Sequence, residues 1–196
     1  EKEHECDALI TAARRGKVCL ANPFRSKAVA NKSTLAVLCD PAFKSLFTAK
    51  ERAAIKKCVP WTRNFEPRTV LWKGKKRDIE DLARRQRREL VLKPADGYGG
   101  KDVHIGRDTK VKDWEAVMHR ALGGNWVLQE FVEPPVDYYP VAGPRGLAYR
   151  RYNVNLNPFA FRGRFGGCIS RLSLTPIINV TAGGAMVPTM TVAPKS

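Results

Sequence analysis

The sequence lacks the patterns that mark several common classes of protein. Its five cysteines are widely scattered and none stands in a Cys-x-x-Cys pair, which argues against both a zinc site and a disulfide framework. This cysteine usage is typical of free thiols in a reducing compartment. No run approaches the roughly 18 apolar residues of a membrane-spanning helix. The charged first residues also lack the apolar segment of a signal peptide, so we expect a cytoplasmic protein with no membrane partner.

Carboxylate side chains are absent from the last part of the chain, where no Asp or Glu follows Asp137. The Lys and Arg residues that remain there are Arg145, Arg150, Arg151, Arg162, Arg164, Arg171 and Lys195. A site built from this part can hold phosphate or carboxylate groups. It cannot offer carboxylate ligands to a magnesium ion, which prefers charged oxygen ligands.

Positive charge is what the chain has in excess, with a formal net charge of +16 at pH 7. Eight of the sixteen residues from Lys73 to Arg88 are Lys or Arg, and such a density attracts nucleotides, nucleic acid or acidic peptides. The same run contains Asp78, Glu80 and Asp81 at helical spacing, which is typical of a solvated helix face. Nucleic-acid binders often interleave aromatic residues with the charge, and only Trp72 lies near this run. Both interpretations stay open.

The segment from Leu90 to Gly106 combines an apolar run, two lysines and a cluster of glycines. Lys93 follows the apolar run, and the tip contains Gly97, Gly99, Gly100 and Lys101. Glycines allow backbone N–H groups to approach a ligand where a side chain would block the way. Successive N–H groups in such a turn form an anion-binding concavity, and flanking ammonium groups favour a polyphosphate. The segment therefore predicts a phosphate-binding turn.

The spacing of this segment differs from the known glycine-rich phosphate loops. A P-loop requires glycine where Ala95 stands and Ser or Thr where Asp102 stands. The dinucleotide-binding and kinase loops require a third glycine at the position of Asp102. Residues 102–106 alternate between polar and apolar, which indicates a strand rather than a helix. We therefore expect a hairpin that covers phosphates as a lid; an ordinary glycine-rich hairpin is the alternative.

Alternation, capping residues and prolines predict the elements along the chain. Helices are expected over residues 6–15, 32–39, 49–58, 78–90 and 113–122. Strands are expected over 16–21, 70–72, 126–132, 152–157, 159–161, 168–172 and 177–180, with a hairpin at 90–106 and a proline-rich loop at 134–144. This order predicts an α+β fold with a nucleotide between two lobes.

The order of motifs resembles the ATP-grasp superfamily, in particular its circularly permuted branch related to glutathionylspermidine synthase. The resemblance is most specific at residues 91–106, 126–133 and 169–184. Residues 18–23, which end in Asn22-Pro23, and the later Asn31-Lys32 also resemble the Asn-Pro and Lys elements that precede the ATP lobes in ribosomal-protein glutamate ligases. It implies two lobes of antiparallel sheet with helices and a nucleotide between them. The expected units are a helical segment at 1–62, a smaller lobe with the glycine-rich hairpin at 63–125, and a second, partial lobe at 126–196.

The resemblance implies a phosphate-binding role for the glycine-rich hairpin. Lys93 would contact the α- and β-phosphates of ATP. The tip, with Gly97, Gly99, Gly100 and Lys101, would fold over the β- and γ-phosphates. A surface position for Lys93 is the alternative.

The other site residues follow from the same resemblance. Backbone atoms of Glu130 and Val132 would bind adenine, and Glu133 is a candidate for the ribose. Arg171 would face the transferred phosphoryl group and the acyl phosphate, and Asn179 would line the same cleft as a second catalytic candidate. A structural ion pair for Arg171 and a simple turn at Asn179 are the alternatives.

The expected magnesium ion has no ligands in this sequence that match the family pattern. The resemblance implies a carboxylate where Asn155 stands, and neutral amides such as Asn155 and Asn157 would bind magnesium weakly. One explanation is that the chain is a fragment whose missing part carries the carboxylates. The other is a degenerate module that binds an anion without catalysis.

Two functions of different classes are therefore predicted. The first is an ATP-dependent ligase module that activates a small-molecule or peptide carboxylate as an acyl phosphate for attack by an amine or thiol, with ATP and Mg²⁺ required. The second is a catalytically incomplete, basic module that binds nucleic acid or another anion. Under the second, the run from Lys73 to Arg88 would dominate binding, and affinity would fall steeply with salt.

Overall fold

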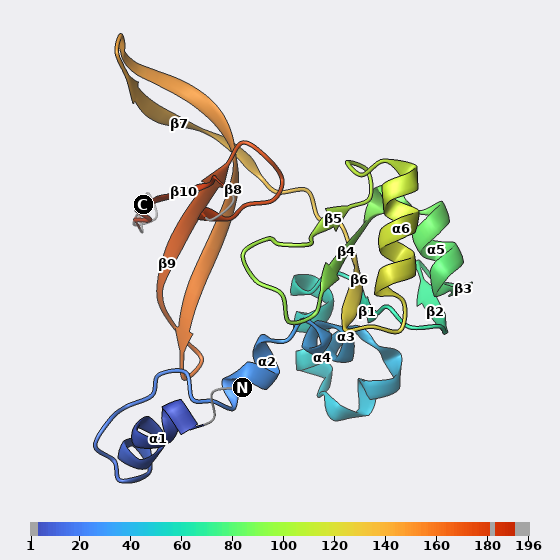
Figure 1. Cartoon of the computed structure of the whole chain (residues 1–196), viewed down its shortest axis with the longest axis horizontal. Helices are drawn as coiled ribbons and strands as arrows, with labels where there is room; N and C mark the ends of the chain where they lie inside the picture. Colours follow the sequence, from blue (N-terminus) through green and yellow to red (C-terminus); the bar gives the residue numbers. More distant parts are fainter. Residues whose placement is uncertain (1–3, 181–182, 191–196) are drawn as a thin grey trace.

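The computed structural model describes residues 4–180 and 183–190 (Figure 1). Its strands are β1 (Thr62–Asn64), β2 (Thr69–Trp72), β3 (Lys75–Asp78), β4 (Leu90–Pro94), β5 (His104–Ile105), β6 (Trp126–Glu130), β7 (Val136–Gly143), β8 (Gly146–Phe161), β9 (Arg164–Ser173) and β10 (Ala185–Val187). Its α-helices are α1 (Asp7–Arg14), α2 (Ser26–Ala30), α3 (Ser33–Cys39), α4 (Ala49–Cys58), α5 (Ile79–Arg85) and α6 (Val111–Ala121), with 3-10 turns η1 (His4–Cys6), η2 (Pro41–Leu46) and η3 (Arg87–Glu89). The predicted α+β class is confirmed.

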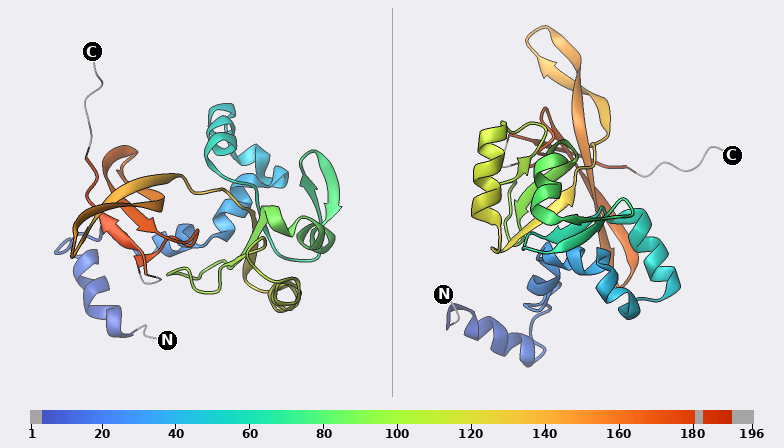
Figure 2. Two further views of the ribbon diagram at one scale, coloured as in Figure 1. Left: turned by 90° about the horizontal axis from the view of Figure 1, so that it is seen from above. Right: turned by 90° about the vertical axis from the view of Figure 1, so that its right-hand side faces the viewer.

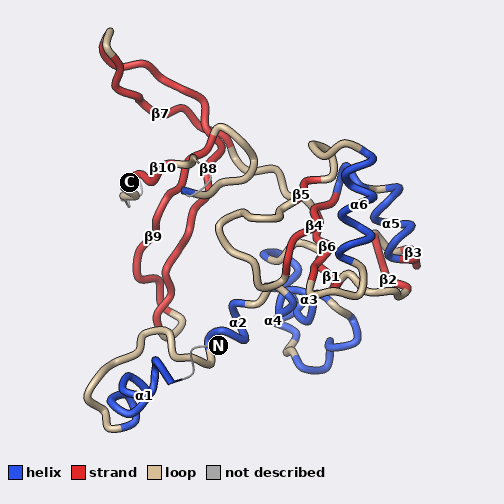
Figure 3. The backbone as a smooth tube through the Cα atoms, viewed as in Figure 1, coloured by secondary structure: helices blue, strands red, loops and turns tan. Residues whose placement is uncertain are grey.

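The strands form three antiparallel sheets (Figure 3). The first has the order β1-β6-β4-β5, the second β10-β9-β8-β7, and β2 with β3 forms a separate hairpin. Strand β6 pairs with β1 on one side and β4 on the other, so it lies in the middle of the first sheet.

The hydrophobic core lies between the first sheet and helices α5 and α6, which cover one of its faces (Figure 1). Leu90, Leu92 and Leu128 point into this core and are fully or almost fully buried. Trp114 of α6 is also fully buried, and its Nε1 donates a hydrogen bond to the carbonyl oxygen of Ala83 in α5, 3.0 Å away. Because side chains alternate along a strand, the residues between these leucines face the opposite side of the sheet.

That opposite face carries Val91, Lys93 and Gln129, and it borders a cavity rather than a second layer of core. In the pairing of β4 with β6, Val91 stands opposite Gln129 and Lys93 stands opposite Val127. The sheet therefore fixes Lys93 and Gln129 as diagonal neighbours on one face.

The second sheet is long and lightly packed. Strands β8 and β9 pair over most of their length, and the β7–β8 hairpin extends away from the rest of the chain (Figure 2). Among the described residues of this sheet, only Val154 and Leu172 belong to the buried hydrophobic set. The first sheet therefore carries most of the core.

Local signals at the helix starts agree with the structure. The Thr48 hydroxyl accepts a hydrogen bond from the backbone N–H of Glu51, and the Glu51 carboxylate accepts one from the backbone N–H of Thr48. These two bonds form a capping box that opens α4 where the sequence predicts it. The hairpin around the glycine-rich tip, predicted at 90–106, is formed by β4 and β5.

Three element predictions are wrong. Residues 16–21 and 177–180, predicted as strands, form no strand, because neither segment pairs with a neighbouring strand and short apolar runs need such pairing. Residues 134–144, predicted as a loop, contain β7. Pro140 is tolerated there because β7 is an edge strand of its sheet.

The boundaries of the three units expected from the sequence, at 1–62, 63–125 and 126–196, stay predictions. Within residues 4–180 and 183–190, no helix is long and apolar enough to cross a membrane.

Candidate functional site

Lys93 is held at the end of β4 by a chain of side-chain hydrogen bonds. Its Nζ donates to Oε1 of Gln129 at 2.5 Å, and Nε2 of Gln129 donates to Oγ1 of Thr62 at 2.7 Å. The Thr62 hydroxyl in turn donates to the carbonyl oxygen of Pro60 at 2.9 Å. Gln129 and Thr62 are buried, so this chain orients the ammonium group in an environment that excludes water.

A second ammonium group, that of Lys32, lies against the same end of β4. Its Nζ donates to the carbonyl oxygens of Pro94 at 3.1 Å and Gly97 at 2.5 Å. Its backbone N–H donates to the carbonyl oxygen of Ala95 at 2.7 Å. Lys32 therefore fastens the start of the glycine-rich tip to the segment between α2 and α3.

Burial and like charge both act on these lysines. Burial lowers the pKa of Lys93 to about 8, and the positive charge of Lys32 contributes to the lowering. Burial also lowers the pKa of Lys32, partly offset by the carboxylate of Asp96. No carboxylate in the described ranges lies within 4.0 Å of the Lys93 Nζ. A polyanion bound beside both lysines would supply the missing negative charge.

The glycine segment, residues 97–101, covers a small cavity next to these lysines. The cavity has a volume of about 130 Å³ and is lined by Lys32, Lys93 and residues 97–101. Gly99 and Gly100 have φ of 71° and 77°, in the left-handed region that favours glycine. A Cβ atom on Gly100 would lie 2.8 Å from Cγ2 of Ile177, so the tip approaches the segment after β9 more closely than a side chain would allow.

A larger cavity of about 320 Å³, here called the apolar slot, continues from this turn. Val91 and Ile105 of the first sheet line it on one side, and the segment Pro176–Ile178 lines it on the other. Lys32 and Lys93 line both cavities, so the slot and the turn share their cationic end. Two apolar walls with cations at one end fit a flat ring attached to phosphates.

The predicted adenine contacts border the apolar slot. Glu130 and Val132 both line it. The N–H of Phe131, between them, donates to the carbonyl oxygen of Glu89 at 2.8 Å, and the N–H of Glu130 donates to that of Trp61 at 2.8 Å. Because these two N–H groups are already hydrogen-bonded, a ligand would contact other backbone groups here, such as those of Val132.

Glu133 lies outside the apolar slot. Both of its carboxylate oxygens accept hydrogen bonds from the guanidinium of Arg107, which lowers the pKa of Glu133. Glu133 lines a neighbouring cavity together with Asn155 and Pro176. The structure therefore brings Lys93, the glycine segment, Glu130 and Val132 together but leaves Glu133 at an exposed ion pair.

Arg171 and Asn179 are not among the residues that line these two cavities. Arg171 in β9 stands opposite Asn155, and its Nε is buried with no hydrogen-bond partner among the described residues. The carbonyl oxygen of Asn179 accepts a hydrogen bond from the N–H of Gly184 at 2.9 Å. A Cβ on Gly100 would lie 3.8 Å from Cβ of Asn179, so Asn179 borders the tip of the turn.

A magnesium site does not fit the described residues. Within them, no group of three or more His, Cys, Asp or Glu side chains is placed to hold a metal ion. Asn157 donates from Nδ2 to Oδ1 of Asn155 at 2.8 Å, so these two amides bind each other.

The basic run from Lys73 to Arg88 is partly neutralised by nearby acids. Lys73 pairs with Glu89, Arg84 with Glu115 and Arg85 with Asp81. Arg87 instead donates to the carbonyl oxygens of Gly106 and Thr109. These contacts favour the interpretation of a solvated surface over a dedicated nucleic-acid face.

Comparisons with protein-family models, with curated proteins and with solved structures found no match for the chain. The assignment of a function therefore depends on the site geometry alone.

Three parts of the site are not among the residues predicted to form it. Lys32 belongs to Asn31-Lys32, which the sequence marks only as part of a family resemblance and which has no predicted role in the site. Gln129 is visible only as the polar residue that interrupts an apolar strand, and the wall Pro176–Ile178 overlaps a segment predicted as a strand. Each acts through a contact with residues distant in the chain, which a local pattern does not contain.

We expect the acceptor on Gln129 to control the pKa of Lys93. Gln129→Leu removes the oxygen that favours the charged ammonium, so the pKa of Lys93 should fall further below 8. Gln129→Glu places a carboxylate there and should raise it. The pH dependence of Lys93 acetylation, followed by mass spectrometry, measures both shifts, with exposed Lys50 as internal control. Identical profiles in the two variants would contradict this role.

Proposed function

We propose that the chain binds ATP with its base in the apolar slot and its phosphates under the glycine segment, as in an ATP-grasp module. We further propose that it activates a carboxylate as an acyl phosphate, which an amine or thiol then attacks. The observation that carries the proposal is the convergence of the Lys32 and Lys93 ammonium groups on a glycine-rich turn at the end of a two-walled apolar slot.

The binding roles follow from the position of each group. Val91 and Ile105 would pack on one face of adenine and Ile178 on the other, because they line opposite walls of the slot. Lys93 would bind the phosphates, and Lys32 would hold the turn in place while adding positive charge. The left-handed backbone at Gly99 and Gly100 is compatible with N–H groups that point at the phosphate oxygens.

The proposed reaction has two steps. A carboxylate oxygen of the substrate attacks the γ-phosphorus of ATP, the bond from that phosphorus to the β–γ bridging oxygen breaks, and ADP leaves. The amine or thiol then attacks the carbonyl carbon of the acyl phosphate, inorganic phosphate leaves, and the nucleophile loses its proton. A preorganised cationic side chain stabilises the negative charge on the phosphoryl oxygens in the transition state. Arg171 is the candidate for this role because its buried Nε lacks a hydrogen-bond partner among the described residues.

Trapping with hydroxylamine tests the reaction. The protein is incubated with ATP, magnesium and a mixture of small-molecule and peptide carboxylates, and acyl hydroxamates and ADP are measured together. We expect hydroxamate in step with ADP, and loss of both in Arg171→Ala. ADP without hydroxamate from any carboxylate would contradict the acyl-phosphate step. No ADP together with tight, salt-sensitive binding of nucleic acid would favour the alternative, a basic module without catalysis.

A further inference from the structure

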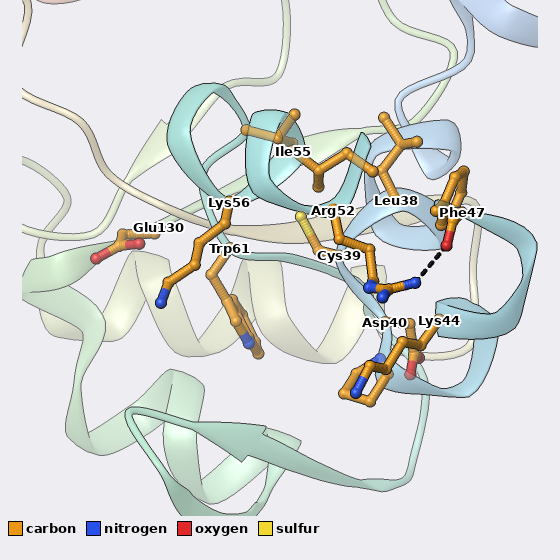
Figure 4. Close-up of a pocket in the computed structure, with 12 residues that line it drawn as sticks. Leu38, Cys39, Asp40, Lys44, Phe47, Arg52, Ile55, Lys56, Trp61 and Glu130 are labelled. Carbon is orange, nitrogen blue, oxygen red and sulfur yellow. Dashed lines mark hydrogen bonds between the residues drawn. The ribbon is translucent and has the colours of Figure 1, made fainter. Parts of the chain in front are cut away.

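A second candidate cavity lies beside the proposed nucleotide site, among the helices that precede β1. Its volume is about 550 Å³, within the range of small-molecule sites. The end of α3, the turn η2 and helix α4 enclose it, with Trp61 on one side and Glu130 at one end (Figure 4). We call it the α3–α4 cavity.

Three cationic side chains line this cavity. Arg52 and Lys56 extend from α4, with Arg52 directed toward Phe47 and Lys56 toward the side where Trp61 lies, and Lys44 comes from η2 (Figure 4). In the part of the chain that the structure describes, none of the three has a carboxylate within 4.0 Å. Nη1 of Arg52 donates to the carbonyl oxygen of Phe47, which fixes the guanidinium and leaves its other donors for a ligand.

The two carboxylates that line the cavity do not cancel this charge. Asp40 is buried, with one oxygen 2.9 Å from Nη2 of Arg68 and the other accepting from the N–H of Ala42. Glu130 lies at the opposite end from Asp40 (Figure 4), so the three cationic side chains face two carboxylates, of which Asp40 is already paired. The cavity therefore has a surplus of positive charge.

The apolar part of the cavity is rigid. The Trp61 ring packs edge-on against Trp72 with centroids 4.8 Å apart, and the Arg63 guanidinium lies 5.0 Å from its centroid. Its Nε1 donates to the carbonyl oxygen of Leu71 at 2.9 Å. Ile55 and Leu38 add aliphatic surface to the lining. A fixed ring and aliphatic groups beside cations match a ligand with a flat apolar body and an anionic group.

We propose that the α3–α4 cavity binds a small organic anion, in which a carboxylate or phosphate is attached to a flat apolar body. The lining of this cavity shares Glu130 with the apolar slot and shares no residue with the cavity under the glycine segment. Glu130 is the last residue of β6 and Trp126 is the first. Trp126 pairs with Pro94, next to the glycine segment, so Glu130 lies at the other end of the strand from that segment. A ligand in this cavity would therefore lie away from the glycine segment, and the tests of its binding are made without ATP.

A matched pair of probes tests the proposal. The fluorescent anion 8-anilino-1-naphthalenesulfonate and its uncharged analogue N-phenyl-1-naphthylamine share nearly the same body and differ in the sulfonate. We expect the anion to bind at least about tenfold more tightly. In ¹H–¹⁵N spectra the anion should shift the indole signal of Trp61 and the backbone signals of Ile55 and Lys56. Equal affinity of the two probes, or shifts confined to β7–β9, would overturn the proposal.

Matched charge reversals locate the charge. Lys44→Glu/Lys56→Glu reverses two lining residues, and Lys50→Glu/Lys57→Glu reverses two exposed residues of α4 that do not line the cavity. Both double variants change the net charge equally. The first should weaken binding of the anionic probe about tenfold and the second less than twofold. Equal losses would contradict the assignment.

Competition experiments on the unmodified chain then separate the two ligand classes. Displacement of the probe by benzoate points to a carboxylate ligand, and displacement by phenyl phosphate points to a phosphate. Displacement by neither, at concentrations up to the solubility limit, would overturn the site without any variant.

Discussion

Replacing Lys93 with methionine is expected to weaken ATP binding by at least about 100-fold. The change removes an ammonium group that is mostly buried and lines both the slot and the turn, where charge-assisted contacts with phosphate are strong. Calorimetric titration with ATP measures the loss. Arg84→Ala is the control, because Arg84 is exposed and paired with Glu115. The ATP affinity of this variant should stay within twofold of that of the parent protein. ATP affinity unchanged by Lys93→Met would contradict the site.

The same substitution should stabilise the protein without nucleotide. The folded state lowers the pKa of Lys93 from its ordinary value of 10.5 to about 8, so at pH 7 folding keeps a buried ammonium charged at a cost. Between pH 8 and 10.5 the unfolded chain binds more protons at this position than the folded chain, and this contribution to the free energy of unfolding rises with pH.

Thermal unfolding of both proteins across this range checks the sign. The advantage of Lys93→Met should be largest below pH 8, about 1 kcal/mol or more, and should vanish near pH 10.5. The lost hydrogen bond to Gln129 reduces the gain. A destabilised variant with no pH dependence would indicate that Lys93 is a structural residue.

Replacing Gly106 with alanine is expected to destabilise the fold by about 3 kcal/mol or more. A Cβ there would lie 1.9 Å from the carbonyl oxygen of Arg87 and 3.1 Å from that of Leu90, and both obstacles are backbone atoms. Gly106 also donates its N–H to the Leu90 carbonyl oxygen at 2.9 Å, so the strand cannot move away without losing this bond. Urea unfolding measures the change.

Gly143→Ala is the matched control for this prediction. The nearest atom to its added Cβ would be the carbonyl oxygen of Gly146 at 3.8 Å, an ordinary contact. Its free energy of unfolding should change by less than about 0.5 kcal/mol. A loss of less than 1 kcal/mol in Gly106→Ala would show that β4 and β5 separate easily. A large loss would show that Gly106 serves packing, whereas Gly99 and Gly100 serve the turn.

The parts of the fold that depend on local sequence could be predicted. Helix α4 begins at Thr48 because the capping box needs only residues three apart, and the hairpin of β4 and β5 follows from apolar alternation around a glycine tip. The α+β class and the placement of Lys93 beside the glycine segment follow from the same local patterns.

The parts that depend on distant contacts could not be predicted. Lys32 reaches carbonyl oxygens more than sixty positions along the chain, and Gln129 meets Thr62 from the middle of another strand. Pro140 and its neighbouring prolines predict a loop where the structure has strand β7. A proline is acceptable in β7 because this strand lies at the edge of its sheet. Residues 177–180 form no strand because they lack a strand to pair with, and Ile177 and Ile178 line the slot instead.

We propose that a polyphosphate bound beside Lys93 raises the pKa of this lysine. The most direct test is calorimetric titration of ATP at pH 8.5, where about half or more of Lys93 is uncharged, in two buffers of different ionisation enthalpy. We expect saturable one-to-one binding with net proton uptake, and no uptake in Lys93→Met. The absence of saturable binding, or equal proton uptake by the two proteins, would contradict it.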